Sequence, residues 1–233
     1  MNGFLTQCKV RKAELLQCIG FLAAAYLLGL VILCIVMNVA KGEGSATVGT
    51  GMAVVFFFFL HLFGIAISFM QEFNVAVSMG ATRKSFVASY ALFNLLEIAV
   101  LELEVILFGW FEKLLIGVFF PHTAMELDIT VFFTWKYLLG VMLGFTILEL
   151  FAGAVILKYG MKVLWVFWAL WMAACLLPVR IAHNEKIMGK LTELGLFFGG
   201  KITPQGIAAA LIVLAILVAG ITWKILRKQR VTA

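Results

Sequence analysis

An uncharged run of 22 residues, 202–223, is the feature that most limits what this chain can fold into. At a rise of about 1.5 Å per residue, a helix of this length crosses the hydrocarbon core of a bilayer. The basic cluster that follows is typical of the cytoplasmic end of a transmembrane helix. Several similar runs precede it, so most of the chain is predicted to lie in lipid. The basic residues are Lys224, Arg227, Lys228 and Arg230.

The composition also indicates a membrane protein. Hydrophobic residues make up 64% of the 233 residues and charged residues 13%, whereas soluble domains have about 45–50% and about 25%. The chain leaves no room for a large soluble domain, so residues 1–233 are expected to form a single transmembrane domain. The Lys and Arg residues gather at the ends of the apolar runs, which explains the net charge of +6 without nucleic acid. No CxxC pair occurs, so neither a metal site nor a redox site is predicted.

The expected fold is an all-α integral membrane protein with six transmembrane helices. With both termini in the cytoplasm, eleven Lys and Arg residues fall inside and seven outside. The positive-inside rule therefore predicts that both termini are cytoplasmic. The chain is expected to be a multi-pass protein of the plasma membrane. The predicted spans are residues 15–39, 51–70, 86–108, 136–157, 163–179 and 206–223.

Amphipathic stretches are expected on both membrane surfaces. Leu5 and Val10 share the N-terminal stretch with Lys9, Arg11 and Lys12, a pattern typical of an interfacial helix. The alternative is a basic tail that only sets the orientation. The segments after the third span and between spans five and six also mix apolar and charged residues at helical spacing. They are expected to lie on the outer surface.

Polar residues inside the predicted spans are candidates for a transport path. A carboxylate at the bilayer centre is costly, so such residues usually face the bundle interior or a watery cavity. The second, third and fourth spans place His61, Glu97 and Glu149 at one depth, where they would form a polar belt. The alternative is structural hydrogen bonding between helices. The complete set is His61, Asn94, Glu97, Glu102, Glu104 and Glu149.

The segment between spans two and three is the most specific local signal. Phe73, Val77 and Gly80 fall on one helical face, and Gly80 can end a helix in the left-handed conformation. Thr82 is then placed to cap the third span. The pattern predicts a short helix on the inner membrane face that turns sharply into a span. An ordinary loop carrying a basic pair is the alternative.

This segment resembles the coupling segment of ABC-transporter permeases of the type-2 export class, also called type V exporters. That family has a Phe, a run of small residues and then Gly-x-[Ser/Thr]-Arg-[Lys/Arg]-x-Phe. Here residues 80–86 read Gly-Ala-Thr-Arg-Lys-Ser-Phe. The length, the six spans and the amphipathic N-terminus are also similar. The motif covers about 15 residues, and the layout covers the whole chain.

The resemblance implies a dimeric permease subunit, paired with an identical copy or a close paralogue and driven by a separate cytoplasmic ABC ATPase. ATP and Mg²⁺ would bind that partner, and this chain would bind no cofactor. The cargo would be amphipathic or hydrophobic, with a peptide as one option, and would move outward. The residues expected to engage the ATPase are Glu72, Phe73, Asn74, Val77, Gly80, Thr82 and Arg83.

Two other functions stay open. A stand-alone proton- or ion-coupled transporter would use the His61, Glu97 and Glu149 belt. An intramembrane enzyme or an assembly factor is the third hypothesis. An enzyme is not expected, because the sequence has no HExxH, GxSxG or GxxxxGK[ST] motif.

Overall fold

The computed structural model describes residues 3–39, 45–121, 125–182 and 204–228, and it is almost entirely helical. Among these residues, three helices are long and apolar enough to cross a membrane, namely Lys12–Val39, Val48–Ser78 and Trp135–Tyr159. They correspond to the first, second and fourth predicted spans. The chain divides into two compact units, one up to Glu149 and one from Leu150.

The chain begins with α1 (Gly3–Val10), which leads into α2 (Lys12–Val39) through a kink at Arg11. Backbone hydrogen bonding continues through the kink, because Arg11 N donates to Gln7 O at 2.9 Å and Leu15 N donates to Arg11 O at 3.0 Å. The predicted N-terminal helix is therefore present. It packs against α5, and α2 packs against both α3 and α5.

The second apolar run forms α3 (Val48–Phe59), a π-helical turn η1 (Leu60–Gly64) and α4 (Ile65–Ser78). The predicted coupling helix is not a separate element, because α4 carries the chain from the span to Ser78 without interruption. No Gly or Pro lies between Ile65 and Ser78 to end the span earlier.

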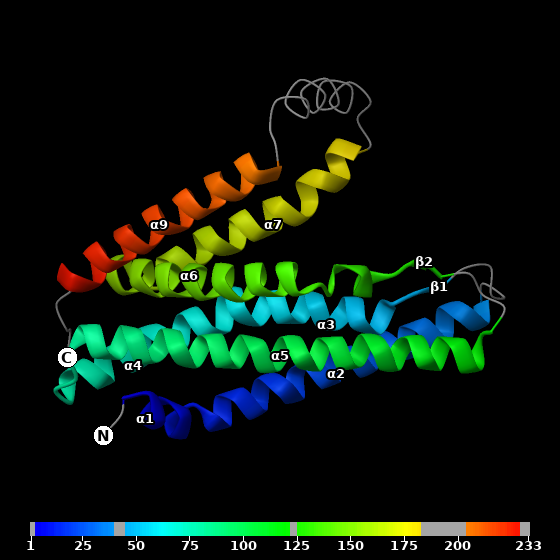
Figure 1. Cartoon of the computed structure of the whole chain (residues 1–233), viewed down its shortest axis with the longest axis horizontal. Coiled ribbons are helices and arrows are strands. Elements are labelled where there is room, and N and C mark those ends of the chain that lie inside the picture. The colour runs from blue at the N-terminus through cyan, green and yellow to red at the C-terminus, as the bar shows by residue number, and fades with distance from the viewer. Residues whose placement is uncertain (1–2, 40–44, 122–124, 183–203, 229–233) are drawn as a thin grey trace. The chain divides into compact units, whose positions relative to one another are not determined.

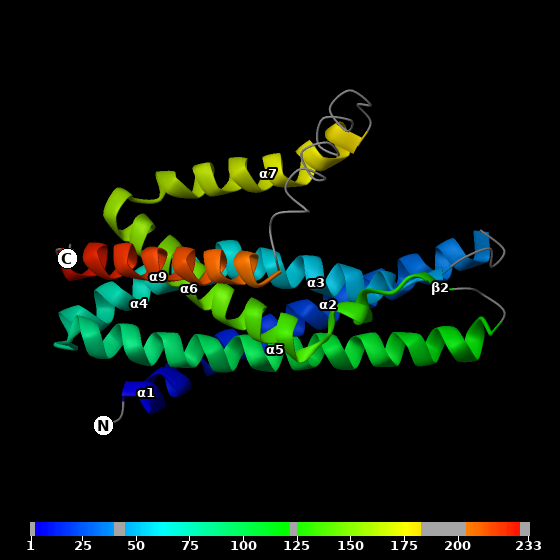
Figure 2. The same ribbon diagram turned by 45° about the horizontal axis from the view of Figure 1, so that its top comes forward.

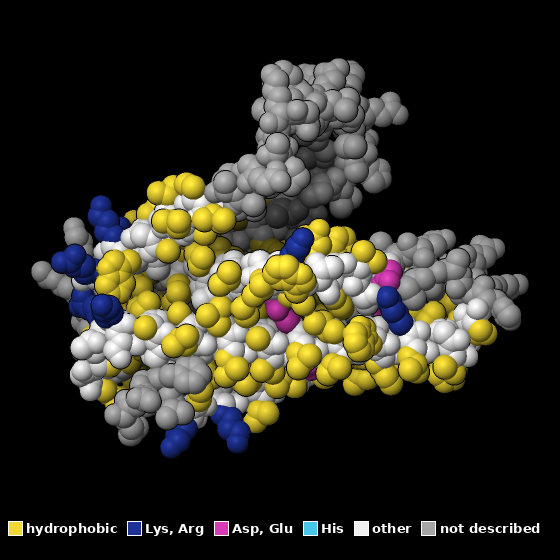
Figure 3. Space-filling model, in the orientation of Figure 1, with side chains coloured by type: hydrophobic (Ala, Val, Ile, Leu, Met, Phe, Trp, Pro, Cys, Tyr) yellow, Lys and Arg dark blue, Asp and Glu magenta, His cyan; other side chains and the backbone are white. Residues whose placement is uncertain are grey.

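The helix α5 (Arg83–Phe119) has 37 residues and is longer than the predicted third span, 86–108. Residues 109–119, expected as a separate outer segment, continue the helix. Gly109 does not break it, and the next proline is Pro121. In both Figure 1 and Figure 2, α1 and the α4–α5 turn lie at one end of this unit. Figure 3 shows apolar side chains along α5 between the two ends.

The opposite end of the first unit is held by short segments. The strands β1 (Ser45–Ala46) and β2 (Met125–Leu127) pair in parallel. Asp128 caps the 3₁₀ turn η2 (Ile129–Phe132) by accepting from Thr130 N at 2.9 Å. Lys113 Nζ of α5 lies 2.6 Å from Asp128 Oδ2.

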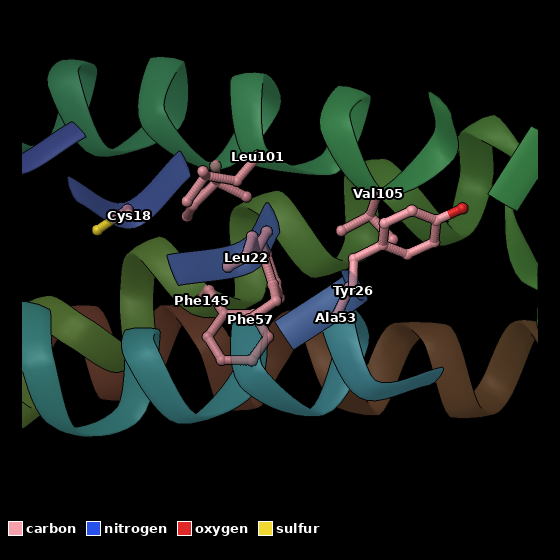
Figure 4. Close-up of a cluster of buried hydrophobic side chains, with 9 residues drawn as sticks. Cys18, Leu22, Tyr26, Ala53, Phe57, Leu101, Val105 and Phe145 are labelled. Carbon is pink, nitrogen blue, oxygen red and sulfur yellow. The ribbon is translucent and has the colours of Figure 1, made fainter. Parts of the chain in front are cut away.

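The core of the first unit lies between α2, α3, α5 and the helix α6 (Trp135–Tyr159). Figure 4 shows Leu22 and Tyr26 of α2 facing the interior beside Phe57 of α3 and Val105 of α5. The Tyr26 ring stacks on Phe108 with centroids 4.2 Å apart. Gly29 lets α2 and α3 approach closely, because a Cβ there would lie 2.6 Å from Gly49 Cα.

The second unit contains α7 (Lys162–Ala182) and α9 (Pro204–Lys228). Gly160 has a φ of 82° and begins the turn between α6 and α7, a conformation that favours glycine. The fifth and sixth predicted spans, 163–179 and 206–223, therefore coincide with helices, although their passage through a membrane stays a prediction. The amphipathic segments expected between these spans fall largely on residues 183–203, outside the described part of the chain.

Candidate functional site

Arg11, at the kink between α1 and α2, is the centre of a buried polar network. Its side chain is 0% exposed, and its three guanidinium nitrogens face acceptors on three other helices or turns. Nη1 donates to Asn94 Oδ1 and Nη2 to Glu97 Oε2, both at 2.9 Å. Nε donates to Glu14 Oε2 at 2.8 Å and lies 3.2 Å from Glu72 Oε1. One side chain thus joins the N-terminal kink to α2, α4 and α5.

Two aromatic rings complete the surroundings of Arg11. Its Cζ lies 4.5 Å from the ring centroids of both Tyr90 and Phe93, a distance at which cation–π attraction is appreciable. Burial alone lowers the pKa of Arg11, whereas Tyr90, Glu97 and Glu14 raise it by a larger amount. The net pKa is raised, so the guanidinium stays charged at physiological pH.

The network continues from α5 to α6 and η1. Asn94 donates through Nδ2 to Glu149 Oε2, and Glu149 Oε1 lies 2.5 Å from His61 Nδ1. These three side chains are at most 1% exposed. His61, Glu97 and Glu149 therefore belong to one connected network, with Arg11 and Asn94 as the links. Their common depth in a membrane stays a prediction. The structure brings His61 to Glu149 and not to Glu97.

The network ends at His61. Its Nε2 is buried and has no hydrogen-bond partner in the part of the chain that the structure describes. Phe57 packs edge-on against the imidazole with centroids 4.3 Å apart, and Phe145 lies at 5.4 Å. Both rings belong to the apolar core. The described residues therefore provide no polar continuation beyond His61.

The α4–α5 turn has the geometry that the sequence predicts. Gly80 has a φ of 88°, and Ser85 N donates to Thr82 Oγ1 at 3.2 Å to cap α5. Side chains before and within the turn are accessible, and Met79 is 81% exposed and Val75 57%. The turn thus presents apolar side chains outside the helical bundle.

The seven predicted coupling residues do not share one environment. Phe73 is fully buried and packs with Phe69 and Phe86, at centroid distances of 6.0 and 5.6 Å. Those two rings also pack against Tyr90. Glu72 faces Arg11. Gly80 and Thr82 are exposed, whereas the other three are half-buried: Asn74, Val77 and Arg83.

Glu102 and Glu104 lie outside the Arg11 network. Each has one buried carboxyl oxygen without a hydrogen-bond partner among the described residues. Glu102 lines a cavity of about 260 Å³, and Glu104 is not among its lining residues. Aromatic rings from α3, including Phe57 and Phe58, and Phe132 of η2 form much of its wall.

Sequence reasoning missed four members of these polar contacts. Arg11 lies in the N-terminal stretch expected as an interfacial helix or a basic tail, and Glu14 follows it in the same stretch. Ser68, which donates to Glu14 Oε1 at 2.6 Å, gave no signal of its own. Glu112 was placed in an outer segment, yet it accepts from Gly49 N and Thr50 N, both at 2.7 Å. Glu97 and Glu104 are seven residues apart, so helical spacing places these two acids on one face of α5. Spacing along one helix does not reveal partners from other helices, such as Arg11, Glu14 and Ser68.

No set of three or more His, Cys, Asp or Glu side chains suited to a metal ion occurs among the described residues. Comparisons of the chain with protein-family models, with curated proteins and with solved structures gave no match.

Proposed function

We propose that this chain is the membrane-spanning permease subunit of an ATP-driven exporter. A separate cytoplasmic ATPase of the ABC class would bind the α4–α5 turn and hydrolyse ATP with Mg²⁺. The permease would work as a dimer with a second copy or a close paralogue, in the plasma membrane with both termini inside. ATP hydrolysis would then move an amphipathic or hydrophobic cargo outward.

The single observation that carries the proposal is the position of Arg11 beside the α4–α5 hairpin. Glu72, its partner on α4, precedes Gly80 by eight residues, about 12 Å along a helix. Asn94 and Glu97, its partners on α5, follow the same turn. A force applied to the turn would therefore act on α4, on α5 and, through Arg11, on α1 and α2 together.

The exposed side chains of the turn support a protein partner there. Met79 and Val75 expose most of their apolar surface at the end of the hairpin, where lipid tails would not cover them in the proposed orientation. The buried Phe69, Phe73, Phe86 and Tyr90 cluster keeps the two helices together behind this surface. Such a rigid hairpin transmits displacement better than a loop that deforms.

The cavity beside Glu102 supports the proposed class of cargo. Its wall is almost wholly aliphatic and aromatic, and its volume of about 260 Å³ lies near the lower end for small-molecule pockets. An apolar group of a cargo molecule fits such a wall. A strongly hydrated cargo would lose its water there without compensation.

The proton-coupled transporter is the alternative, and the network argues against it as a complete path. A proton path must connect both sides of the membrane, whereas the described polar contacts run from Glu72 to His61 and stop there against Phe57 and Phe145. The same contacts support the structural hydrogen bonding that the sequence left open as an alternative.

Purification of the chain from its own host membranes in mild detergent tests the proposal. We expect a nucleotide-hydrolysing subunit to co-purify with it and to be identified by mass spectrometry. A variant with Met79→Asp should lose this subunit and keep its own fold, whereas Phe119→Asp, at the other end of α5, should retain it. Transport that needs no ATPase and follows the proton gradient would refute the proposal.

A further inference from the structure

The cavity beside Glu102 combines a carboxyl group with an aromatic wall. Its volume of about 260 Å³ is lined by residues of α3, α5, η2 and α6, all within the first unit. Aromatic rings come from three of these elements, among them Phe57 and Phe58 of α3, Phe132 of η2 and Tyr137 of α6. A cavity of about 150 Å³ holds a benzene ring. This cavity therefore has room for one ring and a small polar group attached to it.

The aromatic wall reaches from the core to the surface of the unit. Phe57 is only 4% exposed, whereas Phe132 and Tyr137 are 62% and 59% exposed. The rings of Phe132 and Tyr137 lie near each other, with centroids 6.2 Å apart and planes inclined at 61°. A ligand can therefore reach the buried part of the wall past these two exposed rings.

Glu102 is the one charged residue among the described residues that line the cavity. Its Oε1 atom is buried and has no hydrogen-bond partner within the described part of the chain. A buried acceptor without a partner costs free energy, and a donor supplied by a ligand recovers that cost. The ligand that suits this cavity thus carries a hydrogen-bond donor as well as an apolar body.

The chemistry of the wall selects among ligand classes. An anion would bring a second negative charge to Glu102, and a wholly apolar molecule would leave Oε1 unpaired. A metal ion would find a single carboxylate where it needs several oxygen ligands. An ammonium group, by contrast, both donates to a carboxylate and is attracted to the faces of aromatic rings.

We propose that this cavity is a binding site for a hydrophobic organic cation, a protonated amine with an aromatic or alkyl body. The amine donates to Glu102, and the apolar body lies among the rings of α3, η2 and α6. Binding at Glu102 can be measured without the ATPase, whereas the cation's role as cargo rests on the proposed function.

Equilibrium dialysis of the full chain in nanodiscs of zwitterionic lipid tests the site at neutral pH, with binding to empty nanodiscs subtracted. The probes are phenethylamine, which is protonated, and phenethyl alcohol, which is neutral and of nearly the same shape. We expect saturable binding of the amine with a Kd at least about tenfold below that of the alcohol. Equal binding of the two probes, or no saturable binding of the amine, would overturn the proposal.

Three variants locate the site. Glu102→Gln should remove the preference for the amine, whereas Glu104→Gln, two residues later and outside the cavity lining, should keep it. Leu138→Trp places a larger side chain in the wall and should weaken the binding of both probes. A preference that survives Glu102→Gln, or amine binding that is unchanged in Leu138→Trp, would overturn the assignment to this cavity.

The outcomes for the cavity and for the exporter are separate. Selective amine binding by a chain with which no ATPase co-purifies would support the cation site and count against the exporter. A chain that co-purifies with an ATPase but does not prefer the amine would refute the cation site and leave the exporter with a neutral cargo.

Discussion

Arg11 Nε lies 3.2 Å from Glu72 Oε1, although 61 residues separate the two along the chain. This contact ties the kink between α1 and α2 to the last turns of α4. Arg11 also donates hydrogen bonds to Asn94 and Glu97, which connects the kink to α5. Arg11 therefore links the N-terminal helix to the α4–α5 hairpin, to which we propose that the ATPase binds.

Replacement of Arg11 should be among the most damaging single changes. Arg11→Ala leaves Glu72 and its neighbours buried without their cation, and we expect a loss of about 3–5 kcal/mol in the free energy of unfolding. Arg11→Lys should recover only part of this, because Lys lacks the planar fork that reaches Asn94 and Glu97 together. Denaturant titration in detergent measures the loss. Lys9→Ala, at an exposed position two residues earlier, serves as the control and should be near neutral.

Gly29 should tolerate no side chain. A Cβ there would lie 2.6 Å from Gly49 Cα and 2.9 Å from Val48 O, so Gly29→Ala must push α2 away from α3. We expect a destabilisation of about 1–3 kcal/mol. Gly20→Ala lies on the same helix with nothing within 4 Å of its new Cβ, and it should be neutral or slightly stabilising. Equal stability of the two variants would show that α2 and α3 are not packed this closely.

Glu112 should hold the start of α3. Its two carboxyl oxygens accept from Gly49 N and Thr50 N, and Oε2 also accepts from Thr50 Oγ1 at 2.6 Å. Glu112→Gln keeps one acceptor oxygen and turns an amide donor toward an N–H group, at a cost of about 1.5–3 kcal/mol. Hydrogen exchange at residues 48–51 should accelerate. The control Glu104→Gln, also on α5, should leave these amides protected.

Phe73→Ala should lower stability, whereas Met79→Ala should leave stability almost unchanged and lower ATP hydrolysis by the partner. Phe73→Ala empties part of the buried aromatic cluster and should cost about 3–5 kcal/mol. Met79→Ala removes an 81% exposed side chain and should change stability by less than about 0.5 kcal/mol. In a purified complex with the ATPase, however, Met79→Ala should lower ATP hydrolysis. Normal hydrolysis in Met79→Ala would remove this side chain from the partner surface.

Much of the helical framework follows from the sequence, because a long apolar run permits few alternatives in lipid. The left-handed Gly80 and the Thr82 cap are both confirmed, since each depends on the chemistry of one residue. The helix α5 extends past the predicted end of the third span at residue 108. Gly109 lies within it, where Thr130 of η2 approaches the backbone too closely for a larger residue.

The belt of His61, Glu97 and Glu149 was predicted from depth alone, and depth does not reveal partners. Arg11 lies before the first apolar run, where a basic residue normally sets orientation, so nothing in the sequence places it inside the bundle. Its burial depends on the kink and on α1 packing against α5. Arg11 contacts Asn94 and Glu97, which lie 83 and 86 residues later in the chain. Residue spacing within one helix does not reveal such tertiary contacts.

The proposed function requires that the α4–α5 turn lies in the cytoplasm against a nucleotide-hydrolysing partner. Site-directed cross-linking from Met79→Cys, in a chain whose four native cysteines are replaced, tests this claim in native membranes. We predict a cross-link to the ATPase from residue 79 and none from Phe119→Cys. Labelling of residue 79 by a membrane-impermeant maleimide added outside intact cells would contradict the account.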